Sequence, residues 1–283
     1  MILIIIWLII LGLCFGSFIN AAVWRLHEQM QEQGKDRPKK AYLKKLSITR
    51  GRSMCPHCRH ELAAIDLVPV LSWLVLRGKC RYCHKPIPDT PIPEVVLPIL
   101  FLGSYLCWPQ HISGSVVVVF ALWLVMLVGL SILFIYDLKW LILPDKIVYP
   151  LGVVALLMSL FDYAANQTSL GRYIINDVLA ILVGGGIFYV LFQVSRGRWI
   201  GGGDVKLGWV LGLFLGTPSR ALLLIFVAAV AGSLVSIPLL VFRHLKRTSV
   251  IPFGPFLIVG AVVVQLFGTA ILSWYEHLLL INN

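Results

Sequence analysis

The sequence predicts an all-α polytopic membrane protein with about eight transmembrane helices and one sizeable loop domain. Composition is the first reason: 59% of the 283 residues are hydrophobic and 13% are charged, whereas a soluble domain has roughly a quarter charged residues. The second reason is a series of apolar runs. Most of them are close in length to the about 20 residues that a helix needs to cross a bilayer. The third is the unequal distribution of Lys and Arg among the segments that join these runs.

Seven apolar runs have a length compatible with a membrane-spanning helix. They cover residues 1–24, 93–109, 115–136, 147–161, 177–195, 221–242 and 255–274. A shorter, glycine-rich run at 205–217 brings the count to eight. The first run has no basic residue before Arg25, which favours a retained helix over a cleaved signal peptide.

The Lys and Arg side chains predict the orientation of these helices. If residue 1 lies outside, the inside segments are 25–92, 137–146, 196–206 and 243–254, and they hold 22 of the 24 basic residues. An excess of positive charge marks the cytoplasmic side of a membrane protein. Without the short span the last of these segments would lie outside, so the charge bias also supports eight spans. The net charge of +11 therefore reflects topology and does not indicate nucleic-acid binding.

The loop 25–92 contains two C-x-x-C elements, formed by Cys55 with Cys58 and by Cys80 with Cys83. Each element places two thiolates on one side of a tight turn, and this pairing is typical of a four-cysteine zinc site. Two disulfides would need an oxidising compartment, whereas the charge bias places the loop in the cytoplasm. Four cysteines leave the metal no open position, so the zinc is expected to be structural. Three nearby histidines are expected to lie on the surface: His57, His60 and His84.

Asp137 ends the third apolar run. An ionisable group at membrane depth is costly, so it is a candidate for function by default. Asp145 directly precedes the next run and is explained as a helix cap. Asp137 has no such explanation, because the C-terminal end of a helix is unfavourable for a negative charge.

Asp204 follows three glycines, 201–203, and precedes the short glycine-rich run. Gly208, Gly212 and Gly216 follow at intervals of four, which puts them on one helical face with Asp204. Faces of small residues let membrane helices approach closely, so Asp204 is expected to point into a tightly packed bundle. The first apolar run repeats this spacing with Gly12, Gly16 and Asn20.

Asp137 and Asp204 both fall at the inside edge of the predicted bundle. Two carboxylates that share a proton can activate a water molecule and protonate a leaving amine, which is the chemistry of an aspartyl protease. Intramembrane acids also bind ions or relay protons, so an ion-coupled membrane transporter stays open as an alternative. Against it, the acids lie at one interface and the sequence has no repeated halves.

Five sequence elements together span nearly the whole chain. In order, they are Gly16-Ser17-Phe18-Ile19-Asn20 followed by Arg25; the two C-x-x-C elements with Pro69-Val70-Leu71-Ser72-Trp73 and Leu76-Arg77-Gly78-Lys79-Cys80 between them; Asp137 with Leu143-Pro144-Asp145; Gly201-Gly202-Gly203-Asp204-Val205-Lys206-Leu207; and Pro252-Phe253-Gly254-Pro255-Phe256. These elements resemble those of the bacterial prepilin peptidases (type 4 prepilin leader peptidases), many of which are also N-methyltransferases.

The resemblance implies an aspartyl protease of the GxGD type whose catalytic residues are Asp137 and Asp204. Such an enzyme is a hydrolase that cleaves the basic leader peptide from type IV prepilins and type II secretion pseudopilins at the cytoplasmic face. These proteins and the membrane lipids are therefore the expected partners, and no nucleic acid is expected.

Many members of that family also methylate the new N-terminus with S-adenosylmethionine. The resemblance assigns the cysteine loop and the glutamate that follows it, here Glu94, to this methyl-transfer site. The family usually has Ile-Ser-x-Arg-Tyr-Pro-x-Val-Glu at this place, whereas 87–94 lacks the Arg-Tyr pair. A peptidase without methyltransferase activity therefore stays an alternative.

The predicted organisation has three parts. Residues 1–24 form the first transmembrane helix, 25–92 a cytoplasmic four-cysteine zinc-binding domain, and 93–283 a seven-helix membrane-embedded aspartyl protease domain. The protein is expected to lie in the bacterial inner membrane as a multi-pass protein, with its N-terminus outside and its zinc loop in the cytoplasm.

Overall fold

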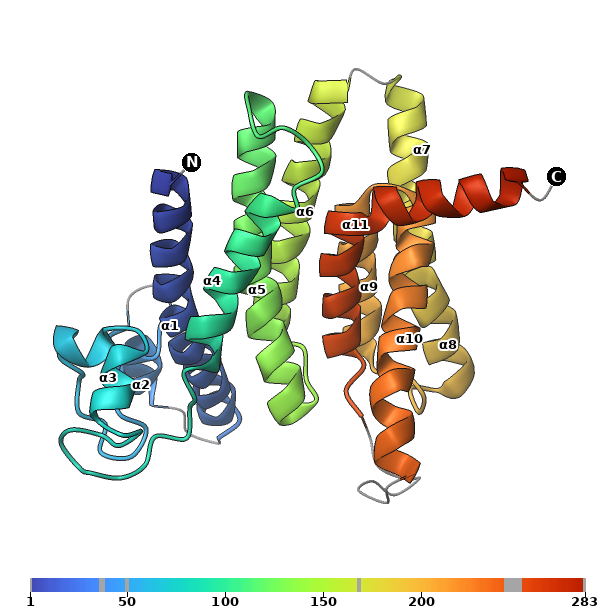
Figure 1. Ribbon diagram of the computed structural model, residues 1–283. Coiled ribbons are helices and arrows are strands. Elements are labelled where there is room, and N and C mark those ends of the chain that lie inside the picture. The colour runs from blue at the N-terminus through green and yellow to red at the C-terminus, as the bar shows by residue number, and fades with distance from the viewer. Residues whose placement is uncertain (1, 36–38, 49–50, 167–168, 242–250, 282–283) are drawn as a thin grey trace. The chain divides into compact units, whose positions relative to one another are not determined.

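The computed structural model describes residues 2–35, 39–48, 51–166, 169–241 and 251–281, and no strand occurs among them. The chain forms two compact units, Met1–Leu106 (unit 1) and Cys107–Asn283 (unit 2). Figure 1 shows that helices make up both units. The all-α fold class predicted from the sequence is confirmed. Most of the basic segment 243–254 lies outside the described residues.

In unit 1, α1 (Ile2–Gln33) packs along α4 (Ile92–Leu106). Two glycines of α1 permit this contact. A Cβ at Gly12 would lie 2.5 Å from Pro98 Cα, and a Cβ at Gly16 would lie 2.5 Å from Glu94 Cα. Only a hydrogen atom fits at such a separation, so the close approach expected from the glycine spacing of the first apolar run is confirmed.

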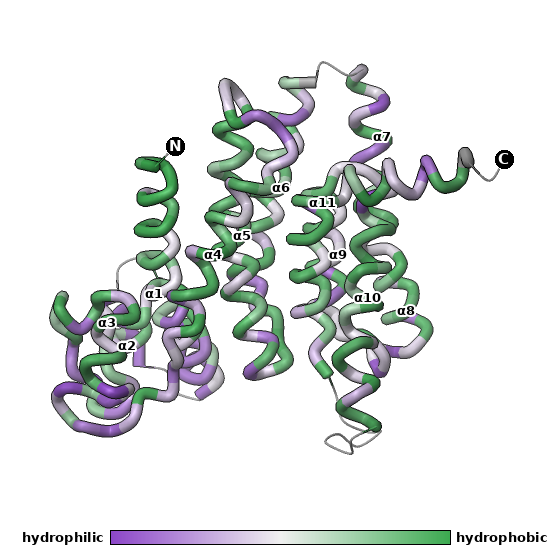
Figure 2. Tube along the Cα trace, viewed as in Figure 1, coloured by the Kyte–Doolittle hydropathy of each residue, from purple (hydrophilic) through white to green (hydrophobic). Residues whose placement is uncertain are grey.

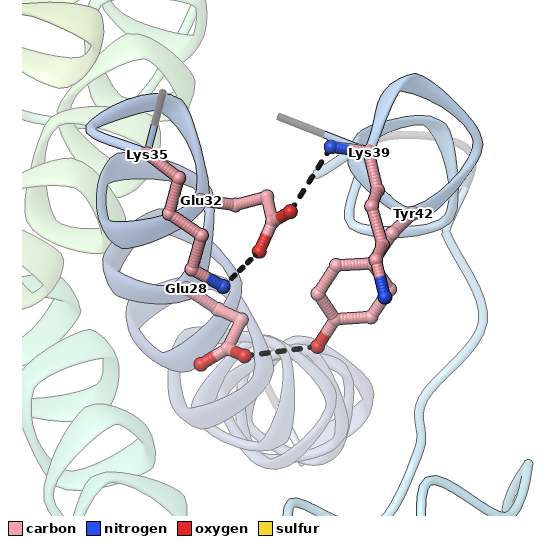
Figure 3. Close-up of polar contacts among 5 residues, drawn as sticks. All are labelled: Glu28, Glu32, Lys35, Lys39 and Tyr42. Carbon is pink, nitrogen blue, oxygen red and sulfur yellow. Dashed lines mark hydrogen bonds and ion pairs between the residues drawn. The ribbon is translucent and has the colours of Figure 1, made fainter. Parts of the chain in front are cut away.

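The polar end of α1 continues beyond the apolar run and is held by the loop that follows (Figure 3). Glu32 is 4% exposed. Its carboxylate accepts a hydrogen bond from the backbone N–H of Lys39 at 3.0 Å and forms an ion pair with Lys35. Tyr42 Oη donates to Glu28 Oε1 at 3.0 Å. These bonds satisfy a buried charge and fix the first part of the loop against α1.

The rest of the loop in unit 1 has short helices and tight turns. The helices are α2 (Lys40–Lys45), η1 (Ala64–Leu67) and α3 (Leu71–Val75). Arg25 of α1 is 5% exposed and donates to the carbonyl oxygens of Ser47 and Ile48 at 3.3 and 3.2 Å. Its guanidinium therefore anchors the loop backbone to α1.

The described part of unit 2 is made of helices. They are α5 (Ser115–Trp140), α6 (Asp145–Asn166), α7 (Leu170–Ile181), the π-helical η2 (Leu182–Gly186), α8 (Ile187–Ser195), α9 (Gly202–Leu215), α10 (Pro218–Val241) and α11 (Gly254–Ile281). Apolar residues run along these helices, whereas hydrophilic residues gather in the loop between α1 and α4 (Figure 2).

Each of the eight predicted apolar runs overlaps a helix of the structure. Among the described residues, six helical stretches are long and apolar enough to cross a membrane: α1, α5, α6, the continuous stretch from α7 to α8, α10 and α11. The protein is therefore a multi-pass membrane protein. The other two helices, α4 and α9, have 15 and 14 residues, fewer than the about 20 of a standard span. The count of eight spans stays a prediction.

Glycines bring η2 and α9 of unit 2 into backbone contact. A Cβ at Gly208 would lie 2.5 Å from the carbonyl oxygen of Gly184. One turn further along, a Cβ at Gly212 would collide with the carbonyl of Ala180. The indole of Trp209 packs on Gly185, where a Cβ would overlap it. This contact fixes the position of α9, whose first turn carries Asp204.

Candidate active site

Asp137 lies in the last turn of α5 and is 5% exposed. The backbone N–H of Gly254, the first residue of α11, donates a hydrogen bond to its carboxylate. The Oδ2 atom of Asp137 is buried and has no hydrogen-bond partner among the described residues. A buried acceptor without a partner is uncommon in native proteins. Such an atom can bind a proton, a water molecule or a second carboxyl group.

Asp204 lies in the first turn of α9 and is half-buried. The backbone N–H of Gly201 donates a hydrogen bond to its carboxylate. The N-terminal end of a helix carries a partial positive charge, which favours a carboxylate at this place. Asp204 is therefore held by the backbone of the glycine segment that precedes it.

The structure brings these two aspartates together. The Asp137 and Asp204 carboxylates interact electrostatically, and α5 and α9 both contact α11. Two interacting carboxyl groups can share one proton. A half-protonated pair can accept one proton and donate another within a single reaction.

Asp145 has a different environment from Asp137. It is the first residue of α6, and its carboxylate oxygens lie 2.8 and 2.9 Å from Lys206 Nζ. Both side chains are more than one-third exposed, so the ion pair contributes at most about 1 kcal/mol to stability. Its effect is local: it ties the start of α6 to the turn of α9 that carries Asp204.

The glycines that follow Asp204 have two different roles. Gly208 and Gly212 meet the backbone of η2 and α7, as expected for a close-packed glycine face. Gly216 has a φ of +68° and ends α9 as its C-cap. Its conformation is the left-handed one that glycine adopts without strain, so helix packing does not explain this third glycine.

The two C-x-x-C elements of unit 1 have matching backbone geometry. In the first, Arg59 N donates to Cys55 O at 2.9 Å; in the second, His84 N donates to Cys80 O at 3.0 Å. Arg59 and His84 have φ angles of +58° and +55°. The elements therefore form two equivalent knuckles, each of which turns its pair of thiols toward the other.

The structure gathers all four predicted cysteine ligands. Their sulfur atoms lie within 4.8 Å of one another, and Cys55 Sγ is 3.8 Å from Cys83 Sγ. Tetrahedral zinc with Zn–S bonds of about 2.3 Å has S–S separations of about 3.8 Å. The cluster can therefore hold a metal ion. The three nearby histidines, His57, His60 and His84, are exposed and lie outside it.

The protonation of these thiols also fits a cation site. Burial raises the pKa of the Cys55 thiol to about 12. Burial acts in the same direction at Cys80, but hydrogen bonds from the backbone N–H groups of Cys83 and Tyr82, together with those to the thiols of Cys55 and Cys83, lower the pKa of that thiol to about 7. A bound cation is needed for all four side chains to be thiolates at neutral pH, because clustered negative charges repel one another.

Glu94 lies in the first turn of α4 and lines a cavity of about 150 Å³ within unit 1. Its side chain is 9% exposed, and its Oε2 atom accepts a hydrogen bond from Val70 N at 2.6 Å. Cys55 and Cys80 also line this cavity. The structure therefore brings Glu94 and the cysteine cluster, which the family resemblance assigns to one activity, to a single cavity.

Two further residues of this cavity were not predicted as site residues from the sequence. The Nε1 atom of Trp73 is buried without a hydrogen-bond partner among the described residues, so it is a donor available to a ligand. The Asp66 side chain is 2% exposed and forms an ion pair with Arg81 Nε at 2.7 Å. Trp73 ends one of the resembling sequence elements, but neither Trp73 nor Asp66 has a spacing that marks a ligand-binding residue, because the fold of the loop brings them to the cavity.

Two family models match the chain. Residues 10–108 match the bacterial peptidase A24 N-terminal domain, and residues 124–237 match the type IV leader peptidase family. These matches together contain both candidate aspartates, the four cysteines and Glu94.

Curated relatives cover most of the chain. A protein of Burkholderia pseudomallei (strain K96243) named prepilin leader peptidase/N-methyltransferase is 33% identical over 280 residues, which cover 92% of this chain and 84% of that protein. Proteins of the same name from Pectobacterium carotovorum subsp. carotovorum and Aeromonas hydrophila are 32% and 29% identical, and the matches cover 89% and 93% of this chain and 89% and 91% of those proteins. No solved structure matches significantly.

Proposed function

The chain belongs to the type IV leader peptidase family, and we propose that it is a membrane aspartic endopeptidase whose catalytic residues are Asp137 and Asp204. In this proposal it cleaves the basic leader peptide from prepilins and type II secretion pseudopilins, and then methylates the new N-terminus. One observation carries the assignment of the residues: two carboxylates interact electrostatically in an apolar helical unit, and one of them has a buried oxygen without a hydrogen-bond partner among the described residues.

The chemistry of cleavage follows from a pair that holds one proton. The ionised carboxylate takes a proton from a water molecule, and the resulting hydroxide adds to the carbonyl carbon of the scissile peptide bond. The protonated carboxyl group gives its proton to the nitrogen of the leaving peptide, and the C–N bond breaks. The reaction consumes one water and returns the pair to its starting charge.

The proposed topology places this reaction at the cytoplasmic face of the bacterial inner membrane. The distribution of basic residues supports an N-terminus outside and a cysteine loop in the cytoplasm. Exposed apolar side chains on the helices support contact with lipid, for example Phe226 of α10 and Leu170 of α7, which are 64% and 55% exposed. A substrate helix would lie in the bilayer with its leader in the cytoplasm.

Zinc is the proposed occupant of the four-cysteine cluster. The clustering of the four sulfur atoms within 4.8 Å and the proposed cytoplasmic location of the loop both support it. With four protein ligands the metal would link the two knuckles and take no direct part in catalysis. Cys55, Cys58, Cys80 and Cys83 would hold it, and it would stabilise the walls of the neighbouring cavity.

S-adenosylmethionine is the proposed methyl donor, and the cavity of unit 1 is its proposed site. The donor has a positively charged sulfonium and an ammonium group, and carboxylates and aromatic faces stabilise such cations. Glu94, Asp66 and Trp73 supply these groups around the cavity. These side chains would hold and orient the donor, which would supply a methyl group to the deprotonated N-terminal amine and leave as the demethylated thioether.

Mass spectrometry of the reaction products tests the proposed function. The purified protein is incubated with a prepilin peptide that contains the leader and the start of the mature chain, with and without S-adenosylmethionine. We expect leader release in both reactions and one added methyl group only with the donor. Asp137→Asn and Asp204→Asn should each abolish leader release and still methylate a pre-cleaved peptide. Retained cleavage in either variant would remove that aspartate from the catalytic pair, and an unmethylated product would limit the protein to proteolysis.

A further inference from the structure

Leu143 lies where three segments of unit 2 meet. It belongs to the connection between α5 and α6 and is 8% exposed. A Cβ at Gly203 would lie 3.1 Å from Leu143 Cβ, and a Cβ at Gly254 would lie 3.5 Å from Leu143 Cδ1. Gly203 directly precedes Asp204, and Gly254 is hydrogen-bonded to Asp137. The Leu143 side chain therefore separates the two backbone segments that hold the aspartates.

Gly254 is in direct contact with the Asp137 carboxylate. A Cβ at this position would lie 2.5 Å from Asp137 Oδ2, so no residue larger than glycine fits without movement. Its backbone N–H donates to the same carboxylate. The peptide is restrained on its C-terminal side because the next residue is Pro255, which limits the conformation of the residue before it. On its N-terminal side, the Phe253 ring packs against Phe188 with centroids 5.7 Å apart.

We propose that Leu143 and Gly254 are positioning residues for peptide-bond cleavage. Gly254 fixes the Asp137 carboxylate with its N–H group and by its lack of a side chain. Leu143 sets the distance between that carboxylate and the turn that carries Asp204. The proposal rests on the proposed function of the two aspartates. A displacement of about 1 Å between catalytic groups can cost about 100-fold in rate, so small changes at either position are expected to affect turnover.

The chain offers a matched control for Leu143. Leu151 of α6 is 4% exposed and packs on another glycine, Gly129 of α5. Leu143→Ala and Leu151→Ala each remove the same atoms from a buried site, but only the first removes the contact between the segments that hold the aspartates. We expect kcat for leader cleavage to fall about 100-fold in Leu143→Ala and less than about fivefold in Leu151→Ala. KM should change little in either variant. The Leu143→Met variant should keep most of the wild-type activity.

Gly260 provides the control for Gly254. It lies on the same helix, and a Cβ there would lie 3.0 Å from Leu224 Cδ1 and 3.1 Å from Leu224 O. Gly254→Ala should lower kcat about 100-fold and change the pH–rate profile, because it disturbs the hydrogen bond that stabilises one charge state of Asp137. Gly260→Ala strains helix packing only, so the pH–rate profile should match that of the wild type.

The experiment uses the full-length protein in lipid nanodiscs, with leader cleavage and thermal unfolding measured on every variant. Equal losses of kcat in Leu143→Ala and Leu151→Ala, or an unchanged kcat and pH–rate profile in Gly254→Ala, would overturn the proposal. If Leu143→Ala does not fold, Leu143→Ile keeps the volume, changes the shape and is judged by the same criteria. Asp137→Asn and Asp204→Asn are run in parallel: cleavage in either one refutes the catalytic pair. If both aspartate variants are inactive while the Leu143 and Gly254 variants behave like their controls, only the positioning inference is refuted.

Discussion

Replacing Gly208 by alanine should impair catalysis more than it impairs folding. The new Cβ would lie 2.5 Å from the Gly184 carbonyl oxygen, and this separation must rise by about 0.9 Å to reach the 3.4 Å at which ordinary contact begins. Overpacking of this kind costs about 1–3 kcal/mol, and the higher helix propensity of alanine offsets about 1 kcal/mol of it. The net loss of stability should therefore be about 2 kcal/mol or less.

The same displacement acts on Asp204, which lies one turn before Gly208 on the same face of α9. Moving this turn away from η2 by most of an ångström changes the separation of the two carboxylates. A rate loss of about 100-fold is expected for a misplacement of this size. The assay is leader cleavage at saturating peptide, with the midpoint of thermal unfolding measured on the same preparation.

Gly152→Ala is the matched control, because a Cβ at Gly152 would lie 3.5 Å from Val210 Cγ2 of α9, an ordinary contact. This variant should keep full activity and gain up to about 1 kcal/mol of stability. Full activity in Gly208→Ala, with unfolding at the wild-type temperature, would refute the claim that the glycine contact sets the position of Asp204. So would equal losses of activity in both variants.

Three further predictions concern other parts of the molecule. Cys55→Ser should lower the metal content, measured by elemental analysis, and an unchanged metal content would contradict the site. The same variant should unfold at a lower temperature, because structural zinc stabilises small domains by about 10 kcal/mol or more. Ser159→Ala removes the hydroxyl that donates to Asp177 at 2.5 Å and should cost about 1–3 kcal/mol in denaturant unfolding, whereas a loss below about 0.3 kcal/mol would show that water replaces it. A double-mutant cycle of Asp145→Asn and Lys206→Met should give a coupling of about 0.2–1 kcal/mol, and a larger value would mean that this exposed pair is shielded from solvent.

Hydropathy located the helices of this protein well, because the membrane requires long apolar runs. It did not locate their ends. α1 continues to Gln33 and α7 begins at Leu170, in both cases through polar turns around residues such as Glu32 and Asp177. Those turns are stabilised by specific hydrogen bonds in the fold, and hydropathy carries no information about such bonds.

The candidate site was predictable where unusual side chains carry the chemistry. Asp137 and Asp204 stand out because charge is rare in apolar helices, and the cysteines stand out by their spacing. The N–H donor of Gly254 and the packing of Leu143 could not be derived in this way. Every residue except proline has a backbone N–H, and a leucine in an apolar chain is ordinary, so only the tertiary structure shows which of them meet the aspartates.

The π-helical segment Leu182–Gly186 has a consequence for how this chain can change in length. A π-turn holds one residue more than the α-turn it replaces, so deleting one residue from η2 would leave a continuous α-helix. Because the extra residue is accommodated within this one turn, the deletion would leave α7 and α8 in nearly the same rotational register. A deletion between Val178 and Ile181 would instead rotate Asp177 by about 100° relative to Gly184, so the contacts of these two residues with Ser159 and Gly208 could not both form. Within Leu170–Ser195, a one-residue deletion is therefore expected to be tolerated in η2 and excluded in the regular turns of α7.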